Sequence, residues 1–156
     1  MRLNIGSGDN IRHGYMNVDT DAKNLPKDIY AQGNKGNLDW LCEDSSCEEI
    51  ISAETIRLFN HEYLRKAVIP NWCKKLEHNG VMKISFSDAF SFAKLLVQNK
   101  ISTEQFNTVM FGSGDGFKSA ICEQLIISIL LENEMSIVTK KYDGLIFYVE
   151  ATKNGQ

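Results

Sequence analysis

The sequence contains no long apolar run. Polar residues interrupt its apolar segments well before the roughly 20 residues that a membrane-spanning helix requires. The opening segment, MRLNIGSGDN, reaches a glycine turn after a few apolar residues, unlike the apolar core of a signal peptide. These absences predict a cytoplasmic protein that does not span a membrane.

The sequence also lacks a metal-binding pattern. Its four cysteines form no CxxC pair, and a chain of 156 residues does not need disulfide bonds to stabilise its core. The three histidines, at positions 13, 61 and 78, have no spacing that would bring two of them together beside a carboxylate. We therefore expect free thiols in a reducing compartment and no metal site.

Charge of neither sign is in large excess. The 17 basic and 20 acidic residues give a net charge of -3, so the total carries no strong signal for nucleic-acid binding. Hydrophobic residues make up 43% of the chain, which is enough for one sizeable core at this length. We expect a single domain over residues 1–156.

Hydrophobic patterning predicts strands that alternate with helices. Period-two or short β-prone runs bounded by turn residues predict seven strands, at residues 2–5, 15–18, 27–32, 48–52, 81–87, 136–141 and 145–152. Helical spacing of apolar residues predicts helices at 54–75, with a kink or division at Pro70, and at 89–99 and 120–132. Asn79 and Gly80 are typical of a left-handed helix stop before the fifth strand.

Two connections refine this arrangement. Residues 6–14 are too few for a full crossover helix, which predicts a shortened first crossover. Asp143 and Gly144 predict a tight turn, so the last two strands should form an antiparallel hairpin. The fold class that follows is α/β, an open mixed sheet of about seven strands of the Rossmann-like kind.

The first and second strands end in residues that suit a nucleotide. Gly6 and Gly8 at the carboxyl end of the first strand would let the backbone approach a ligand closely. Asp19 at the end of the second strand is placed to accept hydrogen bonds from two ribose hydroxyls. Each signal alone is also typical of an ordinary turn, and their order and spacing favour an adenosine site.

At this point the sequence resembles the small class I S-adenosylmethionine-dependent methyltransferases. LNIGSGDNIRHGYMNVDTD, residues 3–21, resembles the family opening LNxGxGxxxxxGxxNVDxD, and looser similarity continues through residues 37–59, 61–88 and 111–135. The resemblance implies S-adenosylmethionine as cofactor. It implies that this cofactor is bound by Gly6, Ser7, Gly8, Asp19, Thr20, Asn37, Leu38, Asp39 and Ala53, with positions 37–39 beside the adenine.

The chain departs from the family pattern at several positions. Ser7 stands where the family often has cysteine, which keeps a small side chain between the glycines. Glu54 stands where histidine is common, and Arg57 and Leu58 replace a Glu-His pair. The segment before the fifth strand lacks the family's Lys-Pro-Gly-Gly but keeps a glycine turn. The changes around Glu54 bear on activity more than on fold.

Methyl transfer needs in-line placement of the acceptor and, for some acceptors, a base. Glu54 and Asp88 follow the fourth and fifth strands, on the edge of the sheet where ligands bind, and are our candidate catalytic residues. The alternatives are a helix-stabilising acid for Glu54 and a helix cap for Asp88. In the 112–118 loop, Phe117 and Lys118 could contact an acceptor, or the loop could be a plain surface loop.

Two functions remain open. The first is a methyltransferase whose acceptor the sequence does not identify. The second is a non-catalytic module that binds S-adenosylmethionine or another nucleotide, or a partner subunit with a degenerate active site; a homodimer or a partner chain is compatible with either. A dehydrogenase-type nucleotide enzyme is less favoured because GSGDN lacks the third glycine of GxGxxG.

Overall fold

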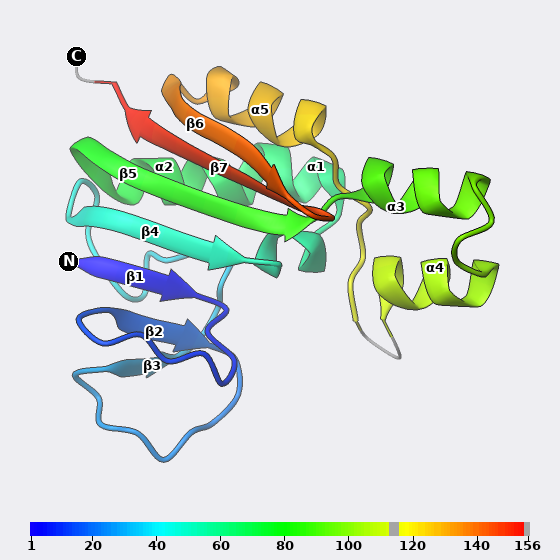
Figure 1. The fold of residues 1–156 in the computed structure, drawn as a ribbon. Coiled ribbons are helices and arrows are strands. Elements are labelled where there is room, and N and C mark those ends of the chain that lie inside the picture. Colours follow the sequence, from blue (N-terminus) through cyan, green and yellow to red (C-terminus); the bar gives the residue numbers. More distant parts are fainter. Residues whose placement is uncertain (113–115, 155–156) are drawn as a thin grey trace.

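The protein is built on one mixed sheet of seven strands. The computed structural model describes residues 1–112 and 116–154, and the strands lie in the order β3-β2-β1-β4-β5-β7-β6 (Figure 1). Their bounds are β1 Arg2–Ile5, β2 Met16–Asp19, β3 Tyr30–Gln32, β4 Cys47–Ala53, β5 Leu76–Ser87, β6 Met135–Asp143 and β7 Ile146–Lys153.

The strand directions confirm the predicted fold class. Strands β1 to β5 are parallel, β7 runs antiparallel to β5, and β6 pairs antiparallel with β7 as the predicted C-terminal hairpin. The carboxyl ends of the five parallel strands therefore share one edge of the sheet, at the right in Figure 1. In open α/β sheets this edge is where ligands bind.

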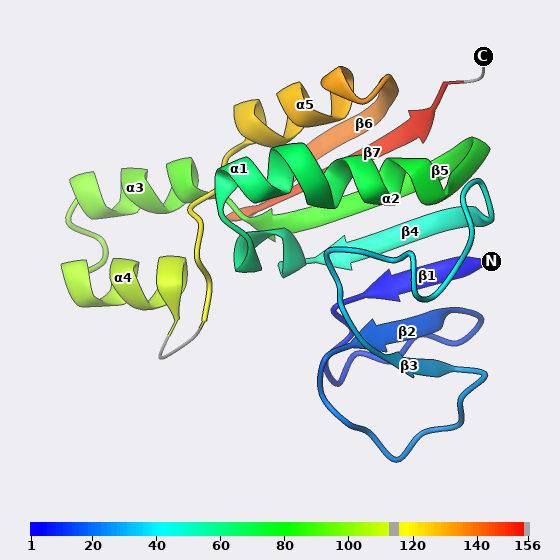
Figure 2. The ribbon, with the colours of Figure 1, turned by 180° about the vertical axis from the view of Figure 1, so that it is seen from behind.

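The helices cover only one face of the sheet. Helices α1, α2 and α5 lie together on the face of the sheet that is turned toward the viewer in Figure 2, whereas α3 and α4 project past the carboxyl-end edge. Within the described residues, no helix occurs in the connections from β1 to β4, so the predicted short first crossover is confirmed. The helical bounds are η1 Thr55–Leu58, α1 His61–Tyr63, η2 Leu64–Val68, α2 Ile69–Lys75, α3 Ala89–Val97, α4 Thr103–Phe111 and α5 Glu123–Glu132.

The core lies between the sheet and these helices. Alternate residues of β5, namely Met82, Ile84 and Phe86, are buried toward the helices. Trp72 of α2 is fully buried against them, and its indole N–H donates to the Lys35 carbonyl. Because one face of β5 packs on the helices and the other does not, residues 80–87 of this strand carry the period-two pattern of one-sided burial. No helix in residues 1–112 or 116–154 has the length and apolar character needed to span a membrane.

The helix predicted over residues 54–75 is divided. A 3-10 turn, η1, ends at Leu58, and Asn60 then caps a second start by accepting a hydrogen bond from the Tyr63 amide. A π-helical turn, η2, precedes Pro70. Wider i to i+5 bonding accommodates a proline that cannot donate in the α-helical pattern, so Pro70 alters the helix without ending it.

The structure also differs from the prediction at the start of β5 and at α4. Strand β5 begins at Leu76 and not at residue 81, and Asn79 uses its positive φ of 62° inside the strand, not as a helix stop. Helix α4 was not predicted, although Ser102 and Gln105 form a capping box at its start. Residues 113–115 of the predicted 112–118 loop lie outside the described part of the chain.

Candidate functional site

The loop after β1 is tied to the end of β2. Gly6 and Gly8 have positive φ angles of 70° and 50°, the region that favours glycine. The amides of Gly6 and Ser7 both donate to the Val18 carbonyl, at 2.8 and 3.2 Å. The loop is therefore a defined turn at the carboxyl ends of two neighbouring strands, as the sequence predicted.

A side chain from the start of η1, just after β4, packs directly on this turn. A Cβ atom on Gly6 would lie 2.0 Å from Oγ1 of Thr55, so the close approach needs glycine. The Thr55 hydroxyl donates to the Ile5 carbonyl at 3.0 Å and is buried. Three strand ends, those of β1, β2 and β4, thus meet at Gly6.

Asp19 is held as a carboxylate beside the turn. Its Oδ2 accepts from the Gly8 amide at 2.8 Å, and its Oδ1 accepts from the Thr20 amide at 2.7 Å. Lys35 Nζ lies 3.0 Å from Oδ1, and both side chains are largely buried. Burial alone would raise the pKa of Asp19, but the bonds from Gly8, Lys35 and Thr20 outweigh it and lower the pKa below its usual value.

Lys35 is a site residue that the sequence reasoning missed. It lies in the loop after β3, in the segment GNKGN, and no local motif marked it. Its ammonium group reaches a small hollow of about 160 Å³ at the carboxyl-end edge. The hollow is lined by Gly6, Lys35, Ala53, Thr55, Leu58 and Phe117, together with Glu54.

The residues predicted beside the adenine are spread along the loop that leaves this edge. Asn37 is exposed and bonds to Asp39, while Leu38 is fully buried in the core. The Asp39 carboxylate pairs with Lys75 Nζ at 2.8 Å, at the end of α2 where β5 begins. The Asp39 side chain is thus directed away from Asp19, whereas the Lys35 side chain reaches the strand ends.

Glu54 is fully engaged with its neighbours. Its Oε1 accepts from the amide and hydroxyl of Ser87, at 2.6 and 2.7 Å, and its Oε2 lies 2.6 Å from Arg57 Nη1. The residue also adopts a left-handed backbone, with φ of 63°. These contacts join the ends of β4 and β5 and give Glu54 a positioning role. Proton abstraction by Glu54 would require breaking the Arg57 pair.

Asp88 caps helix α3. Its Oδ2 accepts from the amide and hydroxyl of Ser91, and the residue has no exposed surface. This is the capping alternative considered from the sequence, and it gives no support to a catalytic role. The fourth- and fifth-strand acids therefore organise the site edge without presenting a free base to a ligand.

Arg57 connects the site to the distal loop. Its buried guanidinium donates to the carbonyls of Val109 and Met110 at the end of α4, and its carbon Cζ lies 3.9 Å from the centre of the Phe117 ring. The Lys118 amide donates to the Arg57 carbonyl at 2.8 Å. Phe117 thereby forms a wall of the hollow, and its predicted contact with an acceptor stays a prediction. The Lys118 prediction stays untested.

Taken together, these residues fit a nucleoside sulfonium such as S-adenosylmethionine. The turn at Gly6 provides close backbone approach, and Asp19 provides a carboxylate whose Oδ2 accepts a single hydrogen bond, from the Gly8 amide. Within the described residues, the buried hydroxyl of Ser7 has no hydrogen-bond partner, which leaves it available to a ligand. Lys35, which is paired with Asp19, brings a cation to the lining of the same hollow.

Comparison with proteins of known structure identifies the fold. No family model and no curated protein matches the chain. A SAM-dependent methyltransferase from Methanosarcina mazei is 12% identical, with a TM-score of 0.70 over 99% of this chain and 92% of its own. One from Mesorhizobium loti is 11% identical, with a TM-score of 0.65 over 97% and 90%.

A third match shows how widely this architecture is used. An O-methyltransferase family protein from Burkholderia thailandensis is 10% identical, with a TM-score of 0.65 over 99% of this chain and 51% of its own. The chain therefore has the class I fold of S-adenosylmethionine-dependent methyltransferases. At these identities the likeness concerns the fold, and a function has to be argued from the site.

Proposed function

We propose that the chain binds S-adenosylmethionine at the carboxyl ends of β1, β2 and β4 and transfers its methyl group to an acceptor. The observation that carries the proposal is the turn at Gly6 and Gly8, folded onto an ionised, largely buried Asp19. A carboxylate beside a glycine turn at neighbouring strand ends is the arrangement that binds a ribose in open α/β sheets. The fold of the matching structures supports the same ligand.

Each residue of the site has an expected role toward this ligand. Asp19 would accept hydrogen bonds from the ribose hydroxyls, with the Gly8 amide fixing its orientation. Lys35 would exchange part of its contact with Asp19 for the carboxylate of the methionine moiety. The backbone beside Ala53 and the ring of Phe117 would border the sulfonium end.

The bound cofactor would supply an electrophilic methyl group, and the protein would supply placement. Alignment of the acceptor with the methyl-sulfur bond can contribute most of the rate enhancement without a catalytic base. This suits a site in which Glu54 is held by hydrogen bonds and Asp88 is fully buried. Glu54 would act by holding the ends of β4 and β5 together.

Calorimetric titration tests the cofactor. S-adenosylmethionine and S-adenosylhomocysteine should both bind, and Asp19→Asn should weaken binding about tenfold or more because a charged acceptor is lost. Asp21→Asn is the matched control, since Asp21 is exposed two residues further along the same turn. No heat with either compound at millimolar concentration would refute the proposal.

A second candidate is a cofactor-binding module without turnover. The engagement of Glu54 by Ser87 and Arg57, and the full burial of Asp88, favour it, because Glu54 is held by its neighbours and Asp88 presents no exposed surface to an acceptor. Turnover separates the two functions. A methyltransferase should release S-adenosylhomocysteine with some member of a broad acceptor panel, whereas the module should bind the cofactor and release none.

A further inference from the structure

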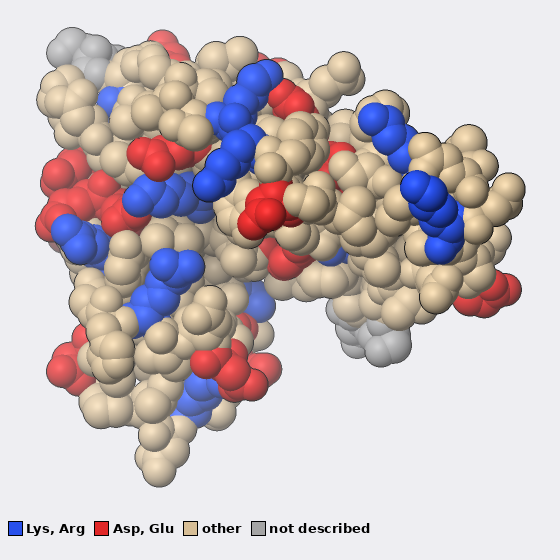
Figure 3. All heavy atoms as spheres, viewed as in Figure 1, with Lys and Arg blue, Asp and Glu red and all other residues tan. Residues whose placement is uncertain are grey.

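One face of the sheet is left open. In Figures 1 and 2 all helices lie against the opposite face or beyond the carboxyl-end edge. Parallel sheets usually have helices on both faces, so five parallel strands with one open face are unusual. Figure 3 views this face and shows basic and acidic side chains interspersed over the strands. The open face is therefore a polar surface that could hold a ligand.

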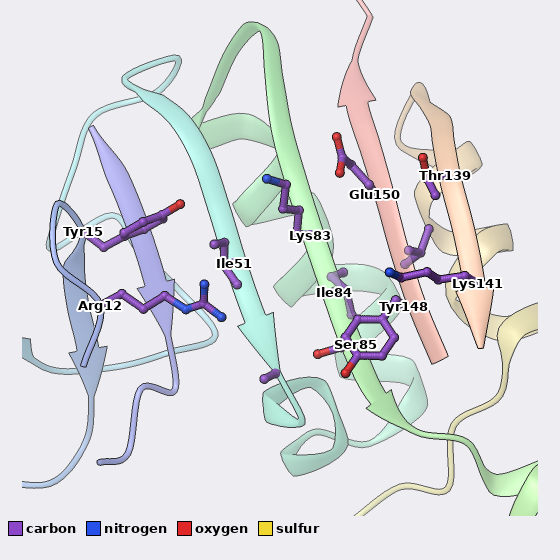
Figure 4. Close-up of a pocket in the computed structure, with 12 residues that line it drawn as sticks. Arg12, Tyr15, Ile51, Lys83, Ile84, Ser85, Thr139, Lys141, Tyr148 and Glu150 are labelled. Carbon is purple, nitrogen blue, oxygen red and sulfur yellow. The ribbon is translucent and has the colours of Figure 1, made fainter. Parts of the chain in front are cut away.

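A hollow of about 340 Å³ lies on this face, across β4, β5, β7 and β6 (Figure 4). Its volume is within the range of small-molecule pockets, about 300–1,000 Å³. Ile51 provides apolar surface in its floor, and Tyr15 and Tyr148 provide aromatic walls. Ala53 lines both this hollow and the smaller one beside Gly6, so the two adjoin at the end of β4.

One wall of the hollow is fixed by a buried amide. Asn17 is fully buried, and its Oδ1 accepts from the Arg12 amide and from Asn4 Nδ2, each at 2.8 Å. Its Nδ2 donates to the carbonyls of Arg12 and Tyr15, both at 3.1 Å. The loop that carries Arg12 and Tyr15 is thus clamped onto the sheet. Binding there would cost little ordering of the backbone.

The charges of the hollow favour an anion. Lys83 is neutralised by Glu49, whose Oε1 lies 2.5 Å from Lys83 Nζ. Within residues 1–112 and 116–154, the Arg12 and Lys141 side chains have no hydrogen bond or ion pair to a carboxylate, and Glu150 is the one acidic residue in the lining. Figure 4 shows Arg12 and Lys141 directed toward the hollow from its two sides. Two cations facing an apolar floor suit a small organic anion.

We propose that this hollow binds a small organic anion, a carboxylate or phosphate with an apolar part, and that this anion is the methyl acceptor. Arg12 and Lys141 would hold its charge, and Ile51 and Tyr148 would hold its apolar part. The acceptor atom would reach the cofactor side past Ala53, where the two hollows adjoin. The acceptor role rests on the proposed function, whereas the binding of the anion does not.

The binding test uses phenyl phosphate as the probe, added to the cofactor-free protein. Amide resonances of Ser85 and Tyr148 should shift in nitrogen-proton correlation spectra, because both residues line the hollow. Arg12→Gln and Lys141→Gln should each weaken binding about tenfold or more through loss of a charge-assisted contact. Benzyl alcohol tests the need for charge, and inorganic phosphate tests the need for the apolar part; both should bind more weakly.

Lys140→Gln is the matched control. Lys140 precedes Lys141 on β6 but points to the other face, where its Nζ lies 2.5 Å from Glu123 of α5. Its replacement should change the affinity for phenyl phosphate by no more than about twofold, well below the roughly tenfold loss expected for Arg12→Gln and Lys141→Gln. Equal losses for Lys140→Gln and Lys141→Gln, or shifts confined to other regions, would overturn the proposal.

Two further measurements separate the outcomes. All three variants should bind S-adenosylhomocysteine as tightly as the unmodified protein does. If the unmodified protein binds phenyl phosphate but not S-adenosylhomocysteine, the proposed function is refuted and the anion site is not. Light scattering tests whether a second copy occupies the open face. A dimer that Arg12→Gln dissociates would overturn the anion site. If methyl transfer occurs, an acceptor whose turnover is unaffected by both Arg12→Gln and Lys141→Gln would overturn the acceptor role.

Discussion

Replacement of Gly6 by alanine isolates the steric demand at the centre of the site. The substitution places a side chain at a φ of 70°, which costs roughly 1–2 kcal/mol for an L-residue. The new Cβ would also lie 2.0 Å from Thr55 Oγ1, so Thr55 must rotate and give up its bond to the Ile5 carbonyl, worth about 1 kcal/mol. We expect Gly6→Ala to lower the free energy of unfolding by about 3 kcal/mol in total.

Gly14→Ala is the control for the backbone contribution. Gly14 has a φ of 79°, but a Cβ there would meet nothing within 4 Å. This variant should therefore lose only about 1 kcal/mol, since it shares the strain and lacks the overlap. Urea unfolding measures both values, and S-adenosylhomocysteine titration should show a loss of affinity for Gly6→Ala alone.

A double-mutant cycle with Thr55→Ala then attributes the difference to the contact. Removing Oγ1 relieves the closest overlap and leaves Thr55 Cβ 3.1 Å away, so the Gly6 substitution should cost about 1 kcal/mol less in this background. If Gly6→Ala and Gly14→Ala were equally destabilising, or if the two changes at 6 and 55 were additive, the packing argument for the turn would be refuted.

Three further predictions concern buried groups. Burial raises the pKa values of Cys47 and Cys73 to about 12, so a thiol reagent at neutral pH should modify only the other two cysteines until the protein unfolds. The pKa of Asp19 is lowered in the folded protein, so the ionised side chain stabilises the fold above the unfolded-state pKa near 3.8, and this stabilisation is lost as the pH falls below that value. Between pH 5 and pH 3, urea unfolding should therefore show a smaller loss of stability for Asp19→Asn than for the unmodified protein. Lys75→Met should cost about 1–2 kcal/mol in urea unfolding and Lys74→Met under about 0.5 kcal/mol, because the Lys75 ammonium is buried beside Asp39 and Asp44 whereas the Lys74 side chain is exposed.

The fold was predictable because its signals are local and repeated. The turn at Gly144 and the alternation in the last two strands predicted the hairpin, and the short link of residues 6–14 predicted the missing crossover helix. The break after Leu58 was missed, and a division was expected only at Pro70, because the apolar spacing continues past Leu58. Asn60, a good N-cap residue, was the available signal for the break.

Only the part of the site that lies at the ends of neighbouring strands was predictable from the sequence. Gly6, Gly8 and Asp19 come together because parallel strand ends meet at one edge, which follows from strand order alone. Lys35 reaches Asp19 from 16 positions away, across a loop without regular structure, and no periodicity encodes that contact. Arg57 was noticed only as a departure from a family pattern, although its burial and its bonds to the end of α4 make it central to the edge.

Two features of the sequence indicate the open face of the sheet. Strand β5 alternates buried Met82, Ile84 and Phe86 with polar residues between them, whereas a parallel strand covered on both faces is apolar almost throughout. The connections from β1 to β4 are also too short or too irregular to supply a second layer of helices. Either observation alone fits several folds, but together they indicate a sheet with one face exposed to solvent. The hollow beside Arg12 and Lys141 lies on this uncovered face, where polar side chains are not packed against helices and remain available to a ligand. No sequence motif marks it.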